Sequence, residues 1–180
     1  HDVAKVLEKF REFLVRHGSI DVLEGKAAAL HEQGVLKQLH SSKVVEDGVL
    51  TKILEEAIAK WKAGDGMAIF NLLADDVVWT VIGSTAVSGT YRSRQAFIDG
   101  AVTAIGSRID GMVAPEIVDI LAVDDTIVLR WDGKGRMRDG APYENRYSWT
   151  MRFQDGKVVE GTAYLDTALV DRLMALPDEN

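Results

Sequence analysis

Residues 143–165 read YENRYSWTMRFQDGKVVEGTAYL, and this stretch decides the fold. From Tyr143 to Gln154 a face of aromatic or apolar side chains, interrupted by Asn145, alternates with a polar face, which predicts a strand with one covered face and one wet face. Asp155-Gly156 is a hairpin turn signal, and Lys157 to Leu165 supplies the partner strand. The stretch therefore predicts an antiparallel hairpin.

Further elements precede and follow this hairpin. Two more strands of a meander are predicted over 116–123 and 126–137, and an earlier strand over 77–82. Helical spacing covers 49–63, 67–73 and 94–105, and Asp166-Thr167 is expected to cap a last helix. Helices followed by an antiparallel meander predict an α+β class, with the sheet curled over the helices.

The first part of the chain carries a separate helical pattern. Residues 2–17 place apolar side chains at steps of three and four, and His17-Gly18 provides a stop. We therefore divide the chain into a helical N-terminal extension, residues 1–47, and an α+β domain, residues 48–180. The apolar stripe of the extension is expected to pack on its own domain or on a second copy, and binding of another partner is the alternative.

Composition excludes several classes of function. The chain has 180 residues, a formal charge of -7 and no cysteine, so nucleic acid and membrane partners are not expected and thiol chemistry is excluded. All 4 histidines precede residue 41, so acid–base chemistry in the domain must use carboxylates, Lys, Tyr or water. We expect no metal and no cofactor. A soluble, cytoplasmic protein is expected, and a secreted or periplasmic product after processing is left open.

Several short motifs, taken in order, resemble a known superfamily. They are Ala63-Gly64-Asp65, Leu73-Ala74-Asp75-Asp76, Ser88-Gly89-Thr90-Tyr91-Arg92, Phe153-Gln154-Asp155-Gly156-Lys157-Val158 and Tyr164-Leu165-Asp166-Thr167. Over about residues 49–175 the chain resembles the SnoaL-like, ketosteroid-isomerase-related branch of the nuclear-transport-factor-2-like superfamily. The resemblance implies a cone-shaped, curved antiparallel or mixed sheet wrapped around about three helices, an apolar pocket in the cone, and a homodimer.

Two chemistries of this superfamily can be checked against the sequence. Matching the steroid isomerases puts Ala57, Thr80 or Val81, and Trp149 where that reaction needs a tyrosine and two aspartates, so steroid isomerisation is not expected. When the sequence is matched to the limonene-type epoxide hydrolases, Arg130-Trp131-Asp132 reproduces their Arg-x-Asp element. There Ala163, Trp79 and Val81 replace the second aspartate, the tyrosine and the asparagine, so epoxide hydrolysis is a minority interpretation.

The resemblance also implies which side chains face the cone. It turns Arg130 and Asp132 inward as an ion pair, and the outward side chains of the same strand would be Ile127, Leu129 and Trp131. Apolar residues on an outer face favour a homodimer. The expected pocket residues are Trp61, Trp79, Val81, Asn145, Tyr147, Trp149 and Ala163. Aromatic residues that alternate along a strand are equally typical of a hydrophobic core without a binding site. The ion pair is equally typical of a contact that only stabilises the structure.

Two classes of function follow from this pocket. The first is an isomerase, lyase or hydrolase acting on a hydrophobic, steroid-, terpenoid- or polyketide-like substrate, with Asp132 as proton acceptor and Arg130 fixing it. The second is a non-catalytic domain that binds a small hydrophobic ligand or serves assembly. The sequence does not separate them.

Overall fold

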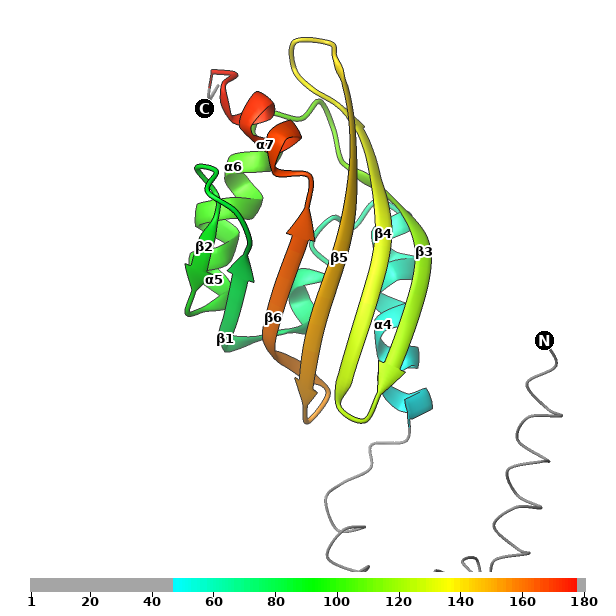
Figure 1. Ribbon diagram of the computed structural model, residues 1–180. Helices are drawn as coiled ribbons and strands as arrows, with labels where there is room; N and C mark the ends of the chain where they lie inside the picture. The colour runs from blue at the N-terminus through cyan, green and yellow to red at the C-terminus, as the bar shows by residue number, and fades with distance from the viewer. Residues whose placement is uncertain (1–46, 178–180) are drawn as a thin grey trace, which may run out of the picture. The chain divides into compact units, whose positions relative to one another are not determined.

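A curved, mixed β-sheet forms the framework of the domain (Figure 1). The computed structural model describes residues 47–177, in which 6 strands pair in the order β2-β1-β6-β5-β4-β3. The strands are β1 (Leu73–Val81), β2 (Gly89–Tyr91), β3 (Ala114–Val123), β4 (Thr126–Arg136), β5 (Pro142–Gln154) and β6 (Lys157–Leu165). The predicted meander from β3 to β6 is antiparallel throughout, whereas β1 joins β6 in parallel. The α+β fold class is confirmed.

Helices cover one face of this sheet. They are α4 (Asp47–Lys62), the short 3-10 helix η1 (Phe70–Leu72), α5 (Arg94–Phe97), the π-helical turn η2 (Ile98–Val102), α6 (Thr103–Gly106) and α7 (Thr167–Met174). In Figure 1, α4 lies behind β4 and β3, whereas α5 and α6 lie beside β1. No helix in the described part of the chain is long and apolar enough to cross a membrane.

The core forms where the apolar stripe of α4 meets the inner face of the sheet. Leu50, Leu54, Ile58 and Trp61 follow one another at helical spacing and are at most 5% exposed. Gly64, with φ 108°, adopts the left-handed conformation that ends this helix. The inner face therefore has one long helix as its cover over β3 to β5.

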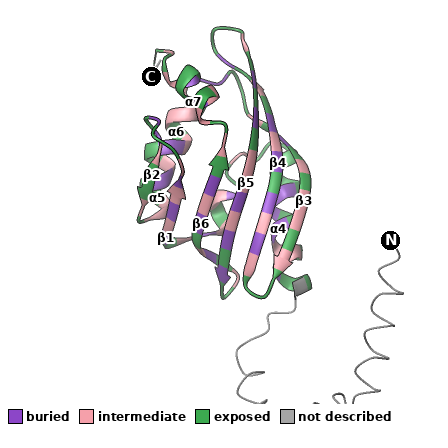
Figure 2. Ribbon diagram, viewed as in Figure 1, coloured by how far each residue is buried: buried purple, intermediate pink, exposed green. Residues whose placement is uncertain are grey.

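Burial alternates along the strands as the sequence predicts for β1, β5 and β6 (Figure 2). On β5, Tyr143, Asn145, Trp149, Met151 and Phe153 are buried and their neighbours are more exposed. One face of this strand thus packs on the core and the other meets solvent, as expected.

The predicted facing of β4 is wrong. Ile127, Leu129 and Trp131 are 0%, 0% and 3% exposed and belong to the core, whereas Arg130 and Asp132 lie on the outer face. The strand pairing is the reason, because Leu129 lies opposite Trp149 of β5 and cross-strand partners share a face. The opposite facing would bury two charges and expose a tryptophan, which is unfavourable.

The charged residues of the outer face pair across strands. Arg130 contacts Asp119 of β3 at 2.5 Å rather than Asp132, and Arg152 contacts Glu160 at 3.1 Å. Such exposed pairs contribute little to stability, about 0–1 kcal/mol each. The homodimer prediction rested on Ile127, Leu129 and Trp131 facing outward, so it loses that basis. Homodimerisation itself stays a prediction.

The helical extension, residues 1–47, lies outside the described residues except for Asp47, which begins α4. Its role, and the division into residues 1–47 and 48–180, stay predictions.

Candidate ligand-binding site

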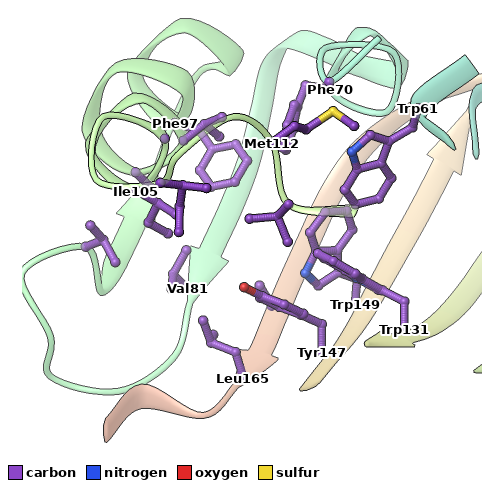
Figure 3. A pocket seen from close by; sticks show the side chains of 18 of the residues that line it. Trp61, Phe70, Val81, Phe97, Ile105, Met112, Trp131, Tyr147, Trp149 and Leu165 are labelled. Carbon is purple, nitrogen blue, oxygen red and sulfur yellow. The ribbon is translucent and has the colours of Figure 1, made fainter. Parts of the chain in front are cut away.

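A cavity of about 200 Å³ lies between the sheet and the helices (Figure 3). The strands β1, β4, β5 and β6 supply one wall, and α5, η2, α6 and residues 106–113 supply the other. Every lining side chain except that of Tyr147 is apolar, a tryptophan or a glycine. The lining residues used below are Trp61, Phe70, Val81, Phe97, Ile105, Met112, Trp131, Tyr147, Trp149, Ala163 and Leu165.

Aromatic rings fix the shape of the strand wall. Trp131 and Tyr147 stack with ring centroids 3.9 Å apart and planes 7° from parallel. Trp149 meets Trp131 edge to face at 5.1 Å and stacks on Trp61 of α4 at 6.1 Å. Offset and edge-to-face contacts are the preferred aromatic geometries, so these rings hold one another in place.

The predicted pocket residues separate into two groups. Trp61, Val81, Tyr147, Trp149 and Ala163 all line the cavity. Trp79 and Asn145 face inward as expected but do not line the cavity of the described domain.

Two different contacts keep Trp79 and Asn145 from the cavity. Trp79 lies in a second layer, stacked on Phe97 at 5.1 Å and in edge contact with Trp149 at 5.4 Å. Asn145 is engaged in hydrogen bonds with its own strand and with the β6–α7 corner.

The wall opposite the strands was not predicted as part of the site. Phe97 and Ile105 line the cavity from α5 and α6, and Met112 lines it from the following loop. A signal was present, because Phe97, Ala101 and Ile105 recur at steps of four, the spacing of one helix face. Strand periodicity alone could not show that this face packs over Val81 and Leu165.

A chain of hydrogen bonds leads from the β6–α7 corner to the cavity. Asn145 Oδ1 accepts from the backbone N of Asp166 at 3.0 Å, and Asn145 Nδ2 donates to the Asp166 carbonyl at 3.1 Å. Nδ2 also donates to Tyr143 Oη at 3.3 Å, and Tyr143 Oη lies 2.6 Å from Tyr147 Oη. Asp166 caps α7 as predicted, accepting from Ala168 N at 3.0 Å. The Tyr147 hydroxyl is thus the cavity end of a chain that is anchored in the backbone.

Burial keeps both tyrosines of this chain neutral. Desolvation raises the pKa of Tyr147 well above 10.0, and the neighbouring Tyr143 adds to the effect. Desolvation also raises the pKa of Tyr143, although the hydrogen bonds that its hydroxyl shares with Tyr147 and Asn145 oppose the increase. At neutral pH the Tyr147 hydroxyl therefore retains its proton and can donate it in a hydrogen bond.

This pKa shift predicts a loss of stability in alkali. Above about pH 10 the unfolded chain releases the Tyr147 proton while the folded protein keeps it, so the free energy of unfolding falls as pH rises. The slope from one such group is at most about 1.4 kcal/mol per pH unit. Urea unfolding at about pH 8 and pH 10.5 measures the effect, which should be smaller in Tyr147→Phe. Equal slopes in both proteins would contradict it.

Arg130 and Asp132 do not reach the cavity. They line a second hollow of about 260 Å³, together with Arg146, Ser148 and Tyr164 of the outer face. Trp131, Tyr147 and Leu165 line both this hollow and the cavity. The predicted ion pair of Arg130 and Asp132 inside the cone is therefore wrong. Catalysis by Asp132 stays a prediction, and it would have to take place on the outer face of the sheet.

Metal ligands do not gather in the described domain. Among residues 47–177, no three His, Cys, Asp or Glu side chains lie close enough together to hold a metal ion. We therefore assign no metal-binding residues to the cavity wall.

A curved mixed sheet, packed over helices with an apolar cavity between them, defines the nuclear-transport-factor-2-like fold. The family model of the SnoaL-like domain matches residues 54–161, and the chain belongs to this family. No curated protein matches the chain.

Solved structures of similar proteins share this fold. An NTF2-like protein from Burkholderia thailandensis is 24% identical, with a TM-score of 0.60, covering 71% of this chain and 98% of the other. A protein of unknown function from Xanthomonas campestris, described as having a cystatin-like fold, is 22% identical, with a TM-score of 0.59 and coverage of 71% and 98%. A protein from Catenulispora acidiphila with a ketosteroid isomerase-like fold, in complex with trimethylamine, is 17% identical, with a TM-score of 0.52 and coverage of 68% and 95%.

Proposed function

We propose that this domain binds a small hydrophobic molecule in the cavity between the sheet and α5–α6. The observation that carries the proposal is an apolar cavity of about 200 Å³ with one oriented hydroxyl in its wall. An apolar lining supplies affinity and a few polar groups supply orientation in small-molecule sites. Empty apolar cavities of about 150 Å³ bind benzene, so a cavity of this size suits a ligand with a single ring.

The lining favours binding over proton-transfer catalysis. Tyr147 is the only titratable side chain that lines the cavity within the described residues. Its pKa is raised well above 10.0 by burial, so it cannot accept a proton at neutral pH. A non-catalytic binding domain is therefore the function that we favour. An isomerase, lyase or hydrolase would need its base from another part of the chain.

The volume also narrows the ligand. A fused four-ring steroid nucleus is far larger than the benzene that fills about 150 Å³. The steroid-like end of the expected ligand range is thus disfavoured, and a compact terpenoid or aromatic molecule fits better. Two structures of the same fold support small-molecule binding as a use of this architecture, since one is a complex with trimethylamine and another was co-crystallized with polyporic acid.

Filling the cavity tests the proposal. Ala163 lines the cavity and is 5% exposed, so Ala163→Leu places about three further carbon atoms in the ligand space. We expect at least a tenfold loss of affinity for α-methylstyrene, measured by tryptophan fluorescence on the full chain. The matched control is Thr162→Leu, the same residue type placed one position earlier, where the side chain points to the outer face. Equal affinity in both variants would contradict the proposal.

Asp132→Asn distinguishes ligand binding in the cavity from ligand binding in the outer hollow. Because Asp132 lies on the outer face and does not line the cavity, the substitution should leave the affinity for α-methylstyrene within twofold and the thermal midpoint within about 2 °C. Native mass spectrometry of the purified protein, before and after the substitution, would show whether a co-purified ligand is retained. Loss of binding in this variant would instead place the ligand on the outer face.

A further inference from the structure

The hydrogen bonds of Asn145 determine how its amide is oriented. The backbone N of Asp166 requires an acceptor, so the atom it meets is Oδ1, and Nδ2 is left with two protons. One proton goes to the Asp166 carbonyl and the other to Tyr143 Oη. The amide of Asn145 is thus fully used, and Tyr143 Oη must act as an acceptor toward it.

The direction of the Tyr143–Tyr147 bond follows from this. Tyr143 is 0% exposed, and its hydroxyl has only Asn145 and Tyr147 as partners among the described residues. If Tyr147 donated to Tyr143, the proton of Tyr143 would be buried without an acceptor, which costs about 1–3 kcal/mol. When an acceptor occupies the cavity, the arrangement that leaves no hydroxyl proton unpaired runs from Asn145 to Tyr143 to Tyr147. In this arrangement Tyr147 Oη accepts from Tyr143, and its own proton remains to be donated.

The Tyr147 hydroxyl faces the ligand space. Figure 3 shows its oxygen directed to the region between Val81, Leu165 and Ile105, away from the stacked Trp131. No other lining side chain of the described domain carries an oxygen. The indole N–H groups of Trp131 and Trp149 are buried without a partner, and their nitrogens have almost no accessible surface. Those groups therefore do not reach a ligand.

We propose that the chain Asn145–Tyr143–Tyr147 presents one hydroxyl proton to a carbonyl oxygen on a compact, single-ring ligand in this cavity. The inference rests on the proposed binding function and adds the chemical class of the ligand. An acceptor is specified rather than a donor, because Tyr147 Oη already accepts from Tyr143. One carbonyl is specified because the remaining lining would leave a second polar group unpaired.

Two probes of similar size test this inference. Acetophenone and α-methylstyrene are similar in size, with a C=O group in one where the other has C=CH₂. On the full chain, Tyr147→Phe should weaken acetophenone binding about fivefold and leave α-methylstyrene within twofold. The infrared C=O band of bound acetophenone should lie at lower wavenumber in the parent protein than in Tyr147→Phe, because a hydrogen bond weakens the C=O bond.

Two further variants distinguish the chain from a general structural effect. In Tyr143→Phe the Tyr147 hydroxyl remains but loses the group that orients it, so the C=O band should move only part of the way back. Tyr143 is a positioning residue, and this band is a readout that a change in stability alone would not shift. Tyr164→Phe removes a hydroxyl that is 50% exposed on the outer face and should change neither affinity nor band.

The outcomes are separable. If both probes bind, but Tyr147→Phe changes neither the acetophenone affinity nor its C=O band, the carbonyl inference is overturned and the binding function stands. If neither probe binds at millimolar concentration, the binding function fails and the inference fails with it. Should Tyr147→Phe not fold, the band of acetophenone bound to the parent protein still decides. A band at the wavenumber seen in hydrocarbon solvent would overturn the inference.

Discussion

Trp149→Ala is expected to lower the free energy of unfolding by about 3–5 kcal/mol, as large-to-small substitutions of buried aromatic residues do. Trp149 is 6% exposed and its ring contacts those of Trp61, Phe70, Trp79 and Trp131. The space left by the indole adjoins the existing cavity. The variant should therefore also bind a two-ring probe such as naphthalene better than the parent protein does. Urea unfolding measures the loss of stability, and isothermal titration calorimetry measures the affinity for naphthalene.

Trp149→Phe is the matched control for this prediction. The indole N–H of Trp149 is buried without a partner in the described domain, so phenylalanine keeps a ring in place while removing an unsatisfied donor. Its cost should be less than half of that of Trp149→Ala. Equal losses would show that ring packing around Trp149 is not what stabilises the sheet.

Gly161→Ala is the second substitution with a large expected effect. A Cβ atom at Gly161 would lie 2.3 Å from Cε3 and Cζ3 of Trp79, which is far inside van der Waals contact. Trp79 cannot move aside easily, because it is 1% exposed and packed between Phe97 and Trp149. We expect a loss of about 1–3 kcal/mol or more from overpacking, measured by urea unfolding.

Gly135→Ala offers the same chemical change without the clash. A Cβ atom there would meet Ile109 and Val113 at 3.6 Å, an ordinary contact distance. The substitution also reduces the freedom of the unfolded chain, so it should be neutral or stabilise by about 0.4–1 kcal/mol. If both alanine variants lost the same stability, the contact with Trp79 would not be the cause.

The strands that were predicted correctly share one property. On β5, every inward residue from Tyr143 to Phe153 except Asn145 is aromatic or apolar and every outward residue is polar, so hydrophobic burial permits a single facing. On β1 and β6 the inward residues are small or β-branched, such as Val81 and Ala163, and they also indicate a single facing. In these strands the local pattern and the tertiary packing agree, so the pattern alone was sufficient to predict which face of each strand is buried.

The predicted facing of β4 was wrong because it rested on a three-residue resemblance, whereas burial determines which way the strand faces. Arg130-Trp131-Asp132 resembles a catalytic motif, and turning that motif inward moved Ile127 and Leu129 outward with it, since strand faces alternate strictly. The alternation of Ile127, Leu129 and Trp131 already indicated the opposite facing. Burial of the Trp131 side chain stabilises the observed facing. The three-residue motif provides no opposing stabilisation, because the residues that would act with it are absent.

The hydrogen-bond chain could not be predicted from the sequence. Tyr143, Asn145 and Tyr147 were correctly placed on one face of β5, but alternation does not show which polar atoms meet. Their bonds depend on the corner at Asp166, which returns to β5 only after the whole of β6 has paired. Tertiary contacts of this kind lie beyond any local pattern.

The parallel pairing of β1 with β6 also sets an order of assembly. β3 to β6 can pair as successive hairpins between neighbouring segments, whereas Val81 waits for Ala163, near the far end of the described chain. Closing so long a loop carries a large entropic cost, so β1 with β2 and α5 should join last during folding and exchange amide hydrogens first. Val81 and Phe97 lie in this part of the fold, and each lines one of the two walls of the cavity. Local detachment of this part would therefore open the cavity to solvent without unfolding the meander.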